Sequence, residues 1–292
     1  MSLRIKFNLM LALAFLSALA VTGVVAYRLL HENARAEVLR NGELMMESSL
    51  AIRRYTVQQV VPNFELQLQR VFLPQSVPAF AATETLNQVR KQFPDYSYKE
   101  AVLNPTNPRD RAADWEADLI NEFRNRDGTA ELSGERDTPT GPLLYIARPI
   151  KINDAACLTC HSTPAAAPAI MIKMYGEANG FGWKLGETVG AQVVTVPMSV
   201  PIENARRLFA AFMVALTGVF ALFFVVLNVM LTRVVIAPVT QLANVADRVS
   251  MGEREVPEFT HRGNDEVSAL TASFNRMRRS LEKAMKLIDG GH

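Results

Sequence analysis

Two cysteines and a histidine within five consecutive residues form the stretch of this chain best suited to do chemistry. Cys157 and Cys160 are the only cysteines, and His161 directly follows the second. Two thiols at this spacing can reach the two vinyl groups on one edge of a haem, and the adjacent imidazole can then reach the iron. The stretch therefore predicts one covalently attached haem c, held by Cys157 and Cys160, with His161 as an iron ligand.

Three other uses of a Cys-x-x-Cys pair fit the sequence less well. A thioredoxin-like redox pair opens a helix after a buried strand, whereas residues 162–168 form a loop rich in alanine and proline. A structural zinc site needs about four ligands. The remaining histidines are His31, His261 and His292, of which the last two fall across a membrane in the topology given below. A disulfide between such near neighbours closes too short a loop to stabilise much.

The ligand on the second face of the iron is left open by the sequence. Met171 and Met174 follow the motif closely, and a thioether ligand would raise the haem potential. Met45 and Met46 lie on a long predicted helix. Methionines in apolar stretches are more often core residues than ligands. Three tyrosines either contact the haem or simply pack in the core: Tyr55, Tyr96 and Tyr98. Arg53 and Arg54 either pair with the haem propionates or lie on a solvated helix face.

Two long runs of the chain contain no charged residue, 7–27 and 208–232. Each run reaches the ~20 residues with which a helix crosses a bilayer. A cleaved signal peptide is the alternative for the first run, but its apolar stretch is long for a signal sequence. A buried core helix is the alternative for the second run, whose apolar side chains lie all round the helix. We therefore expect two transmembrane helices, at 1–29 and 208–232.

The charges that flank these runs predict the topology. Arg4 and Lys6 precede the first run and Arg233 follows the second, so the positive-inside rule places both termini in the cytoplasm. Arg28 and Arg206 lie on the opposite flanks and weaken this signal. Covalent haem attachment takes place outside the bacterial cytoplasm, which independently puts residues 30–206 in the periplasm. We expect a two-pass protein of the bacterial inner membrane, with membrane lipid around both helices.

The patterning between the two runs predicts a mixed α+β domain with an antiparallel sheet. Helices are expected at 29–69, 79–92 and 112–126, and strands at 96–102, 143–150 and 188–196. Turn signals at 127–128 and 138–142 flank further strand material. The haem motif lies between the last two strands. A loop rich in glycine and aromatic residues follows it, at 175–183.

Several stretches between residues 45 and 200 carry a family resemblance: AIRRYT (51–56), PAFAATE (78–84), YSYKEA (96–101), NPTNP (104–108), Trp115 with Glu116, GERD (134–137) and GFGW (180–183). Together they resemble the bacterial c-type haem sensor family with a PAS-like fold. The resemblance implies one haem c per domain, on Cys157, Cys160 and His161, and a role in sensing redox state or a gas. At least one relative uses a cysteine as the distal iron ligand. This chain has no third cysteine, so that ligand does not carry over.

The residues after the second run form two apolar series separated by a polar connector at 250–264. The first series is Val235, Val239, Leu242, Ala246 and Val249, and the second is Val267, Leu270, Phe274, Met277, Leu281, Ala284 and Ile288. Such heptad spacing predicts two helices that must bury an apolar seam. With Pro238 and Asp265-Glu266 as landmarks, 233–292 resembles the HAMP signalling module. An ordinary helical hairpin is the alternative. The resemblance implies a parallel homodimer.

Three functions remain open on the sequence. The first is a membrane-bound haem c sensor that passes a redox or small-ligand signal to the HAMP dimer and on to a separate cytoplasmic signalling protein. The second is a membrane-anchored electron-transfer cytochrome whose HAMP segment serves only for dimerisation. The third is a cytochrome with catalytic activity. We expect no enzymatic output in this chain, because no nucleophile, acid–base pair or phosphate loop stands out. The net charge of +2 gives no reason to expect a nucleic-acid partner.

Overall fold

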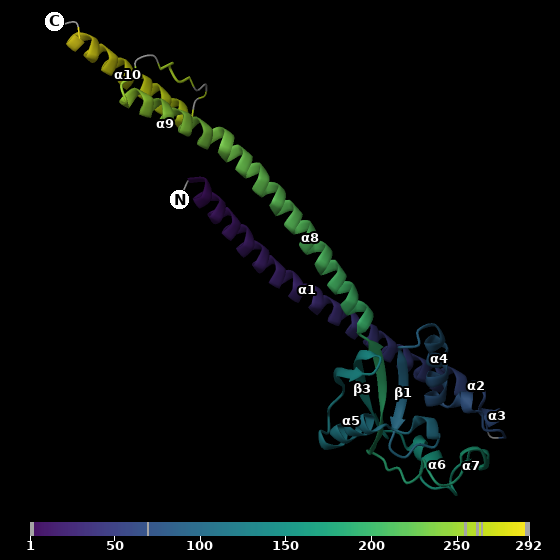
Figure 1. Ribbon diagram of the computed structural model, residues 1–292. Coiled ribbons are helices and arrows are strands. Elements are labelled where there is room, and N and C mark those ends of the chain that lie inside the picture. The colour runs from purple at the N-terminus through teal and green to yellow at the C-terminus, as the bar shows by residue number, and fades with distance from the viewer. Residues whose placement is uncertain (1–2, 69, 254–255, 261–262, 264, 290–292) are drawn as a thin grey trace. The chain divides into compact units, whose positions relative to one another are not determined.

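The structure is a computed structural model that describes residues 3–68, 70–253, 256–260, 263 and 265–289. The chain divides into two compact units, one of residues 28–208 and the other of residues 1–27 with 209–292. Figure 1 labels their α-helices and the strands β1 and β3.

A four-stranded antiparallel sheet forms the centre of the 28–208 unit (Figure 1). Its strands are β1 (Ser97–Val102), β2 (Leu132–Thr138), β3 (Gly141–Lys151) and β4 (Thr188–Pro197), in the spatial order β1-β4-β3-β2. β2 and β3 form a hairpin that closes at Gly141, whose φ of +116° is a conformation that glycine adopts without strain. β4 lies between β1 and β3 and is buried along nearly its whole length.

Helices cover both faces of this sheet. On one face, α1 (Leu3–Tyr55) and α4 (Pro78–Gln92) contribute Val38, Met46, Ala82 and Leu86 to a core with Tyr98, Leu144, Ile146, Val194 and Val196. On the other face, α5 (Asp114–Asn125) contributes Leu119, Ile120 and Phe123 to a core with Ala101, Ala147, Ala191 and Val193. Because side chains alternate along a strand, the neighbours Val193 and Val194 enter different cores.

The long helix α1 continues without a break from the first apolar run to Tyr55. A π-helical turn (Thr56–Val60) follows, and then the short helices α2 (Val61–Asn63) and α3 (Glu65–Leu68). The helix predicted at 29–69 is therefore confirmed as far as Asn63, with π-helical hydrogen bonding at 56–60. The π-helical turn lies next to Pro62, which lacks the N–H that a regular α-helical turn would need.

The other predicted elements are confirmed as α4, α5, β1, β3 and β4. β2 occupies the stretch between the turns at 127–128 and 138–142, where strand material was expected without exact bounds. This strand lies at the edge of the sheet and all of its side chains are exposed or half-buried, so it lacks an alternating apolar pattern. The mixed helix and strand architecture is thus confirmed.

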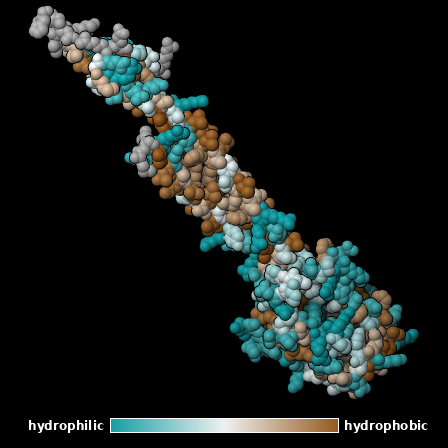
Figure 2. Space-filling view, viewed as in Figure 1, coloured by the Kyte–Doolittle hydropathy of each residue, from teal (hydrophilic) through white to brown (hydrophobic). Residues whose placement is uncertain are grey.

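Two helices are long and apolar enough, by length and composition, to cross a membrane: Arg4–Asn63 and Ser199–Ser250. Within the second, α8 (Ser199–Met230) passes through a π-helical segment (Leu231–Ile236) into α9 (Ala237–Ser250). The two apolar segments pack on each other, with Phe15 stacked on Phe220 at 5.1 Å between ring centroids. Gly23 also faces Met213 closely. Figure 2 shows apolar side chains gathered over these segments.

The helices α9 and α10 (Glu266–Asp289) pack through one side only. Leu242, Val256 and Thr271 are buried there, and the Asn275 amide donates to the Phe259 carbonyl at 2.8 Å. The predicted seam of the second helix is mostly outside this contact, because Leu270, Met277 and Leu281 are each more than half exposed. The Ile288 side chain, His261 and His292 lie outside the described residues.

Candidate cofactor site

The two cysteines and His161 share one face of a short helical segment. A 3-10 turn (Ala155–Cys157), whose start is capped by the Asp154 carboxylate accepting from the Ala156 N–H at 2.8 Å, leads into α6 (Leu158–His161). Residues three and four apart lie on the same side of a helix, so Cys157 is followed on its own face by Cys160 and His161. Both thiols are free and half-buried. This arrangement suits attachment of one planar group through two thiols.

The imidazole of His161 is held through one ring nitrogen. Its Nδ1 lies 2.8 Å from the Gly180 carbonyl, and because a carbonyl can only accept, Nδ1 carries the proton. Burial lowers the pKa of His161, against the opposing effect of that carbonyl, so the ring is neutral near pH 7. The Nε2 lone pair is therefore free to bind a metal. An imidazole that donates its other N–H to a carbonyl is the usual state of a metal-ligating histidine.

The glycine- and aromatic-rich loop fixes the plane of this ring. Trp183 stacks on His161 with 3.9 Å between ring centroids and 14° between planes. The backbone N–H of Trp183 donates to the His161 carbonyl at 3.2 Å, and the backbone N–H of Gly182 donates to the Ser162 carbonyl at 3.0 Å. The loop at 175–183 thus folds back onto the haem motif that precedes it.

Gly180 is the position where this loop tolerates no side chain. Its φ is +86°, and a Cβ there would lie 2.8 Å from the Cα of Thr106. The Thr106 hydroxyl is itself 3.5 Å from His161 Nδ1. The NPTNP stretch, the haem motif and the GFGW stretch, far apart in the sequence, therefore meet around one imidazole.

A buried ion pair lies beside the motif. Arg53 on α1 donates to both oxygens of Glu100 on β1, at 2.6 and 2.5 Å, and the Tyr98 hydroxyl donates to the same carboxylate at 2.8 Å. Arg53 is also within electrostatic reach of Cys157. Burial raises the pKa of Tyr98, which keeps the phenol neutral and a donor. The sequence analysis left Arg53 as either a haem contact or a solvated residue, and its observed partner is Glu100.

Two charged residues that the sequence analysis treated only as turn residues complete this region. The Arg109 guanidinium pairs with Glu84, lies 3.5 Å from the Asp110 carboxylate and covers the Phe80 ring at 5.0 Å. Burial raises the pKa of Asp110 to about 6, although Arg109 opposes the shift. A half-buried carboxylate in a short 3-10 turn leaves no periodic signal, so its environment could not be predicted from the sequence.

The candidate distal ligands differ in how far their side chains are buried. Met46 is fully buried in the core between α1 and the sheet, and Met45 packs against the same core. On α7 (Ala169–Tyr175), Met171 is buried and Met174 is 52% exposed. Met46 is thus a core residue, as methionines in apolar stretches usually are. The tyrosines also differ: Tyr55 is exposed, whereas Tyr96 packs against the core.

Two family models match the chain, each in a separate region. A family model described as Tll0287-like matches residues 31–197, and a HAMP domain model matches residues 230–283. Among solved structures, a match described as the crystal structure of the cyanobacterial heme-protein Tll0287 has 16% sequence identity and a TM-score of 0.43, and covers 55% of this chain and 95% of that one. No curated protein matches the chain.

Proposed function

Because this chain belongs to the Tll0287-like family and carries a HAMP domain, we propose that it is a membrane-bound haem c sensor. In this proposal a redox or small-ligand signal, from a gas or a redox partner, reaches the HAMP domain and then a separate cytoplasmic signalling protein. The proposal gives the chain no enzymatic role and no nucleic-acid partner. It also keeps the PAS-like reading of the 30–206 domain, which the antiparallel sheet supports.

The observation that carries the proposal is the state of His161. Its Nδ1 proton is donated to Gly180, so Nε2 is available on the same helical face as two free thiols. Cys157 and Cys160 would hold one haem per chain through their Sγ atoms, and His161 would bind the iron. The bound haem would supply a centre that changes its charge or its axial ligand. Trp183 and Gly180 keep the imidazole in one orientation.

The chain offers two continuous routes from this region to the apolar segments. Arg53, within electrostatic reach of Cys157, belongs to the same helix as the first apolar run. On the other side, β4 ends at Pro197 and α8 begins at Ser199, from which the helical chain continues through the π-helical segment into α9. A change beside Cys157 could therefore displace a helix that has no intervening linker.

The test of haem attachment uses the two thiols. The unchanged protein should stain for haem on a denaturing gel, and the protein with Cys157→Ala and Cys160→Ala should not. Retained staining in the double variant would refute the site. The absorption spectrum of the reduced protein with and without carbon monoxide then separates the two functions. A spectral shift indicates an open or displaceable distal position, as a sensor needs, whereas an unchanged spectrum would favour the electron-transfer cytochrome.

The proposed location is the bacterial inner membrane, with residues 30–206 in the periplasm and both termini in the cytoplasm. The two long apolar helices and the HAMP domain support it. A reporter that is active only in the periplasm should be active when fused after Asp137 and silent when fused after Asp289. The reverse pattern would contradict both the location and the covalent haem.

A further inference from the structure

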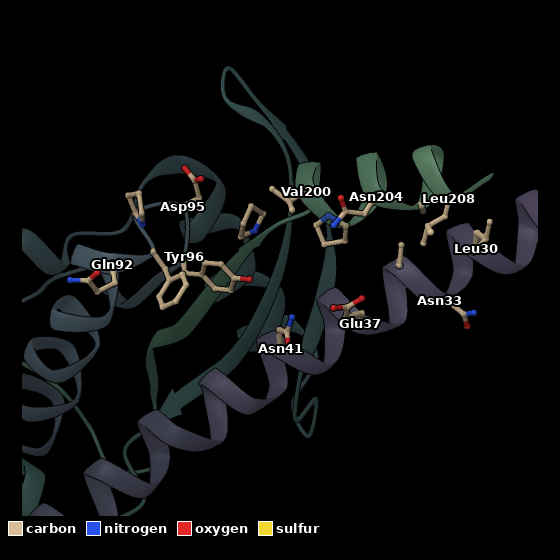
Figure 3. A pocket seen from close by; sticks show the side chains of 16 residues that line it. Leu30, Asn33, Glu37, Asn41, Gln92, Asp95, Tyr96, Val200, Asn204 and Leu208 are labelled. Atoms are coloured by element: carbon tan, nitrogen blue, oxygen red, sulfur yellow. The ribbon is translucent and has the colours of Figure 1, made fainter. Parts of the chain in front are cut away.

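A hollow of about 480 Å³ lies at the end of the 28–208 unit from which α1 and α8 depart (Figure 3). Three segments line it: one side of α1, the turn at 92–96 after α4, and the start of α8. Its base includes Ala34, Pro197 and Ala205, which are small and buried. The volume falls within the range of roughly 300–1,000 Å³ that is typical of sites for small organic ligands.

The polar groups of this hollow have no partners of their own. Six side chains with carboxylate or amide groups line it: Asn33, Glu37, Asn41, Gln92, Asp95 and Asn204. In the described part of the chain, none of the six makes a side-chain hydrogen bond or an ion pair. Figure 3 shows Asn41 and Glu37 rising from α1, Asn204 extending from α8 and Tyr96 reaching in from the turn. Carboxylate and amide groups from three segments therefore line one open hollow, where all of them except the half-buried Asn41 are exposed.

The charge of the lining selects the ligand. Glu37 and Asp95 are its only charged residues, so the hollow is negative and disfavours anions. Phe93 and Tyr96 add an aromatic pair, edge to face, with 5.9 Å between ring centroids. Arg90 does not line the hollow, and its Nε donates to the Pro94 carbonyl at 3.4 Å. Carboxylates, amide oxygens and an aromatic ring together are the groups that bind an ammonium ion.

We propose that this hollow is a binding site for a small organic ammonium ion. The N–H groups of the ion would donate to the Glu37 and Asp95 carboxylates and to the amide oxygens of Asn41 and Asn204. The ligand would bridge α1 and α8, the two helices that continue into the apolar runs. The same chemistry has two sources, a free amine in solution and the amine headgroup of a lipid. Only the lipid source rests on the proposed membrane location.

The free-amine source is tested by calorimetric titration of the full chain in detergent micelles with ethanolamine, ethylamine and, as an uncharged comparison, ethylene glycol. An amine should bind saturably and ethylene glycol should not. The double variant Glu37→Gln, Asp95→Asn should bind the amine at least about tenfold more weakly, because charge-assisted hydrogen bonds are lost. Glu43→Gln, an exposed carboxylate on α1 that does not line the hollow, should leave binding unchanged.

The lipid source is tested by native mass spectrometry after purification from nanodiscs that contain either phosphatidylethanolamine or phosphatidylglycerol. Retention of phosphatidylethanolamine that the double variant loses and Glu43→Gln keeps would identify a headgroup as the ligand. Thermal melts followed by circular dichroism check that each variant is folded. The proposal is overturned if neither arm shows saturable binding, if the double variant binds as tightly as the parent, or if phosphatidylglycerol is retained equally. Haem staining, unaffected by these changes, keeps this outcome separate from the proposed function.

Discussion

The imidazole of His161 is oriented by protein contacts alone. The Gly180 carbonyl accepts its Nδ1 proton, and Trp183 lies flat against the ring. Both partners belong to one loop, and that loop also bonds the backbone on the carboxyl side of α6. A ligand held in this way loses little freedom when it binds a metal, because its ring plane and tautomer are already fixed.

Gly180→Ala should destabilise the protein more than a positive φ alone explains. Its new Cβ would meet the backbone of Thr106, whereas Gly186, with a φ of +83°, has open space around it. We expect Gly180→Ala to lower the free energy of unfolding by about 3 kcal/mol and Gly186→Ala by about 1 kcal/mol. Thermal unfolding measures both, and the near-ultraviolet circular dichroism of Trp183 should change only in Gly180→Ala. Equal losses in the two variants would contradict the close approach to Thr106.

Asp110 should make the stability of the protein depend on pH. Burial raises its pKa in the folded state to about 6 from 3.8, so the folded protein holds this proton more tightly than the unfolded chain. The contribution to stability is then fully present below about pH 4 and is lost as the pH rises to about 6. Allowing for screening by solvent, the loss is about 1 kcal/mol. Unfolding measured from pH 4 to 7 should show this decline in the parent and not in Asp110→Asn.

The matched control for this prediction is Asp127→Asn. Asp127 is exposed and bonds Lys151 at 2.9 Å, which lowers the pKa of its carboxyl. Its contribution has the opposite sign, being present above its unfolded pKa and lost at lower pH. The Asp127→Asn profile between pH 4 and 7 should therefore run parallel to that of the parent. A decline that persists in Asp110→Asn would mean that another group carries it.

The residues of the candidate site were predictable to different degrees. Cys157, Cys160 and His161 stand together in the sequence, so their spacing alone predicted a shared site. The Arg53–Glu100 pair joins residues 47 positions apart, and neither residue shows a pattern that names its partner. Gly180 stood out in the sequence only as part of a stretch that carries the family resemblance. No side chain fits at this position because Thr106 lies against it, and only the fold brings the two residues together.

At the scale of elements, the contact of α1 with the sheet depends on one glycine. A Cβ at Gly42 would lie 2.8 Å from the Ile146 Cδ1 and 3.4 Å from Val196. Both of those side chains are fully buried. The absence of a side chain at Gly42 lets the helix approach the sheet closely enough for Val38 and Met46 to fill the space on either side.

Gly42→Leu should force α1 away from the sheet. Four additional carbon atoms would enter a space already filled by Ile146 and Val196, and overpacking of this kind costs roughly 1–3 kcal/mol. Glu43→Leu places the same side chain at the next, exposed position and should change the free energy of unfolding by less than about 0.5 kcal/mol. Chemical denaturation measures both values. A Gly42→Leu variant as stable as Glu43→Leu would show that α1 does not pack tightly there.

The elements themselves were predictable where one face of each is apolar. α5 buries Leu119, Ile120 and Phe123 against the sheet, and this spacing is visible in the sequence. β2 was predicted only as strand material between two turns, because an edge strand that exposes most of its side chains carries no alternation. The π-helical turn at 56–60 was not predicted, since it contains residues that suit an ordinary helix.

At the scale of the whole molecule, α9 and α10 leave an apolar stripe without a partner in the described part of the chain. Val267, Thr271 and Arg278 lie on the side of α10 toward α9, whereas Leu270, Met277 and Leu281 are 51%, 63% and 51% exposed. Leu270 and Met277 are seven residues apart and Met277 and Leu281 are four apart, so all three lie on one side of the helix. A helical seam of this kind is stable in water when another helix covers it.

We expect a second copy of the chain to cover this stripe. If two copies pair through it, a cysteine at Leu281 should form a crosslink between copies, above the background of the parent protein. Met277→Asp would place a charge in the paired seam at a cost of several kcal/mol, and should abolish the crosslink. Met277 suits this test better than Phe274, which is half-buried within the single chain. Ala272→Asp introduces the same charge on the opposite, exposed side of α10 and should leave the crosslink intact. Crosslinking that survives Met277→Asp would mean that the stripe is not the interface between copies.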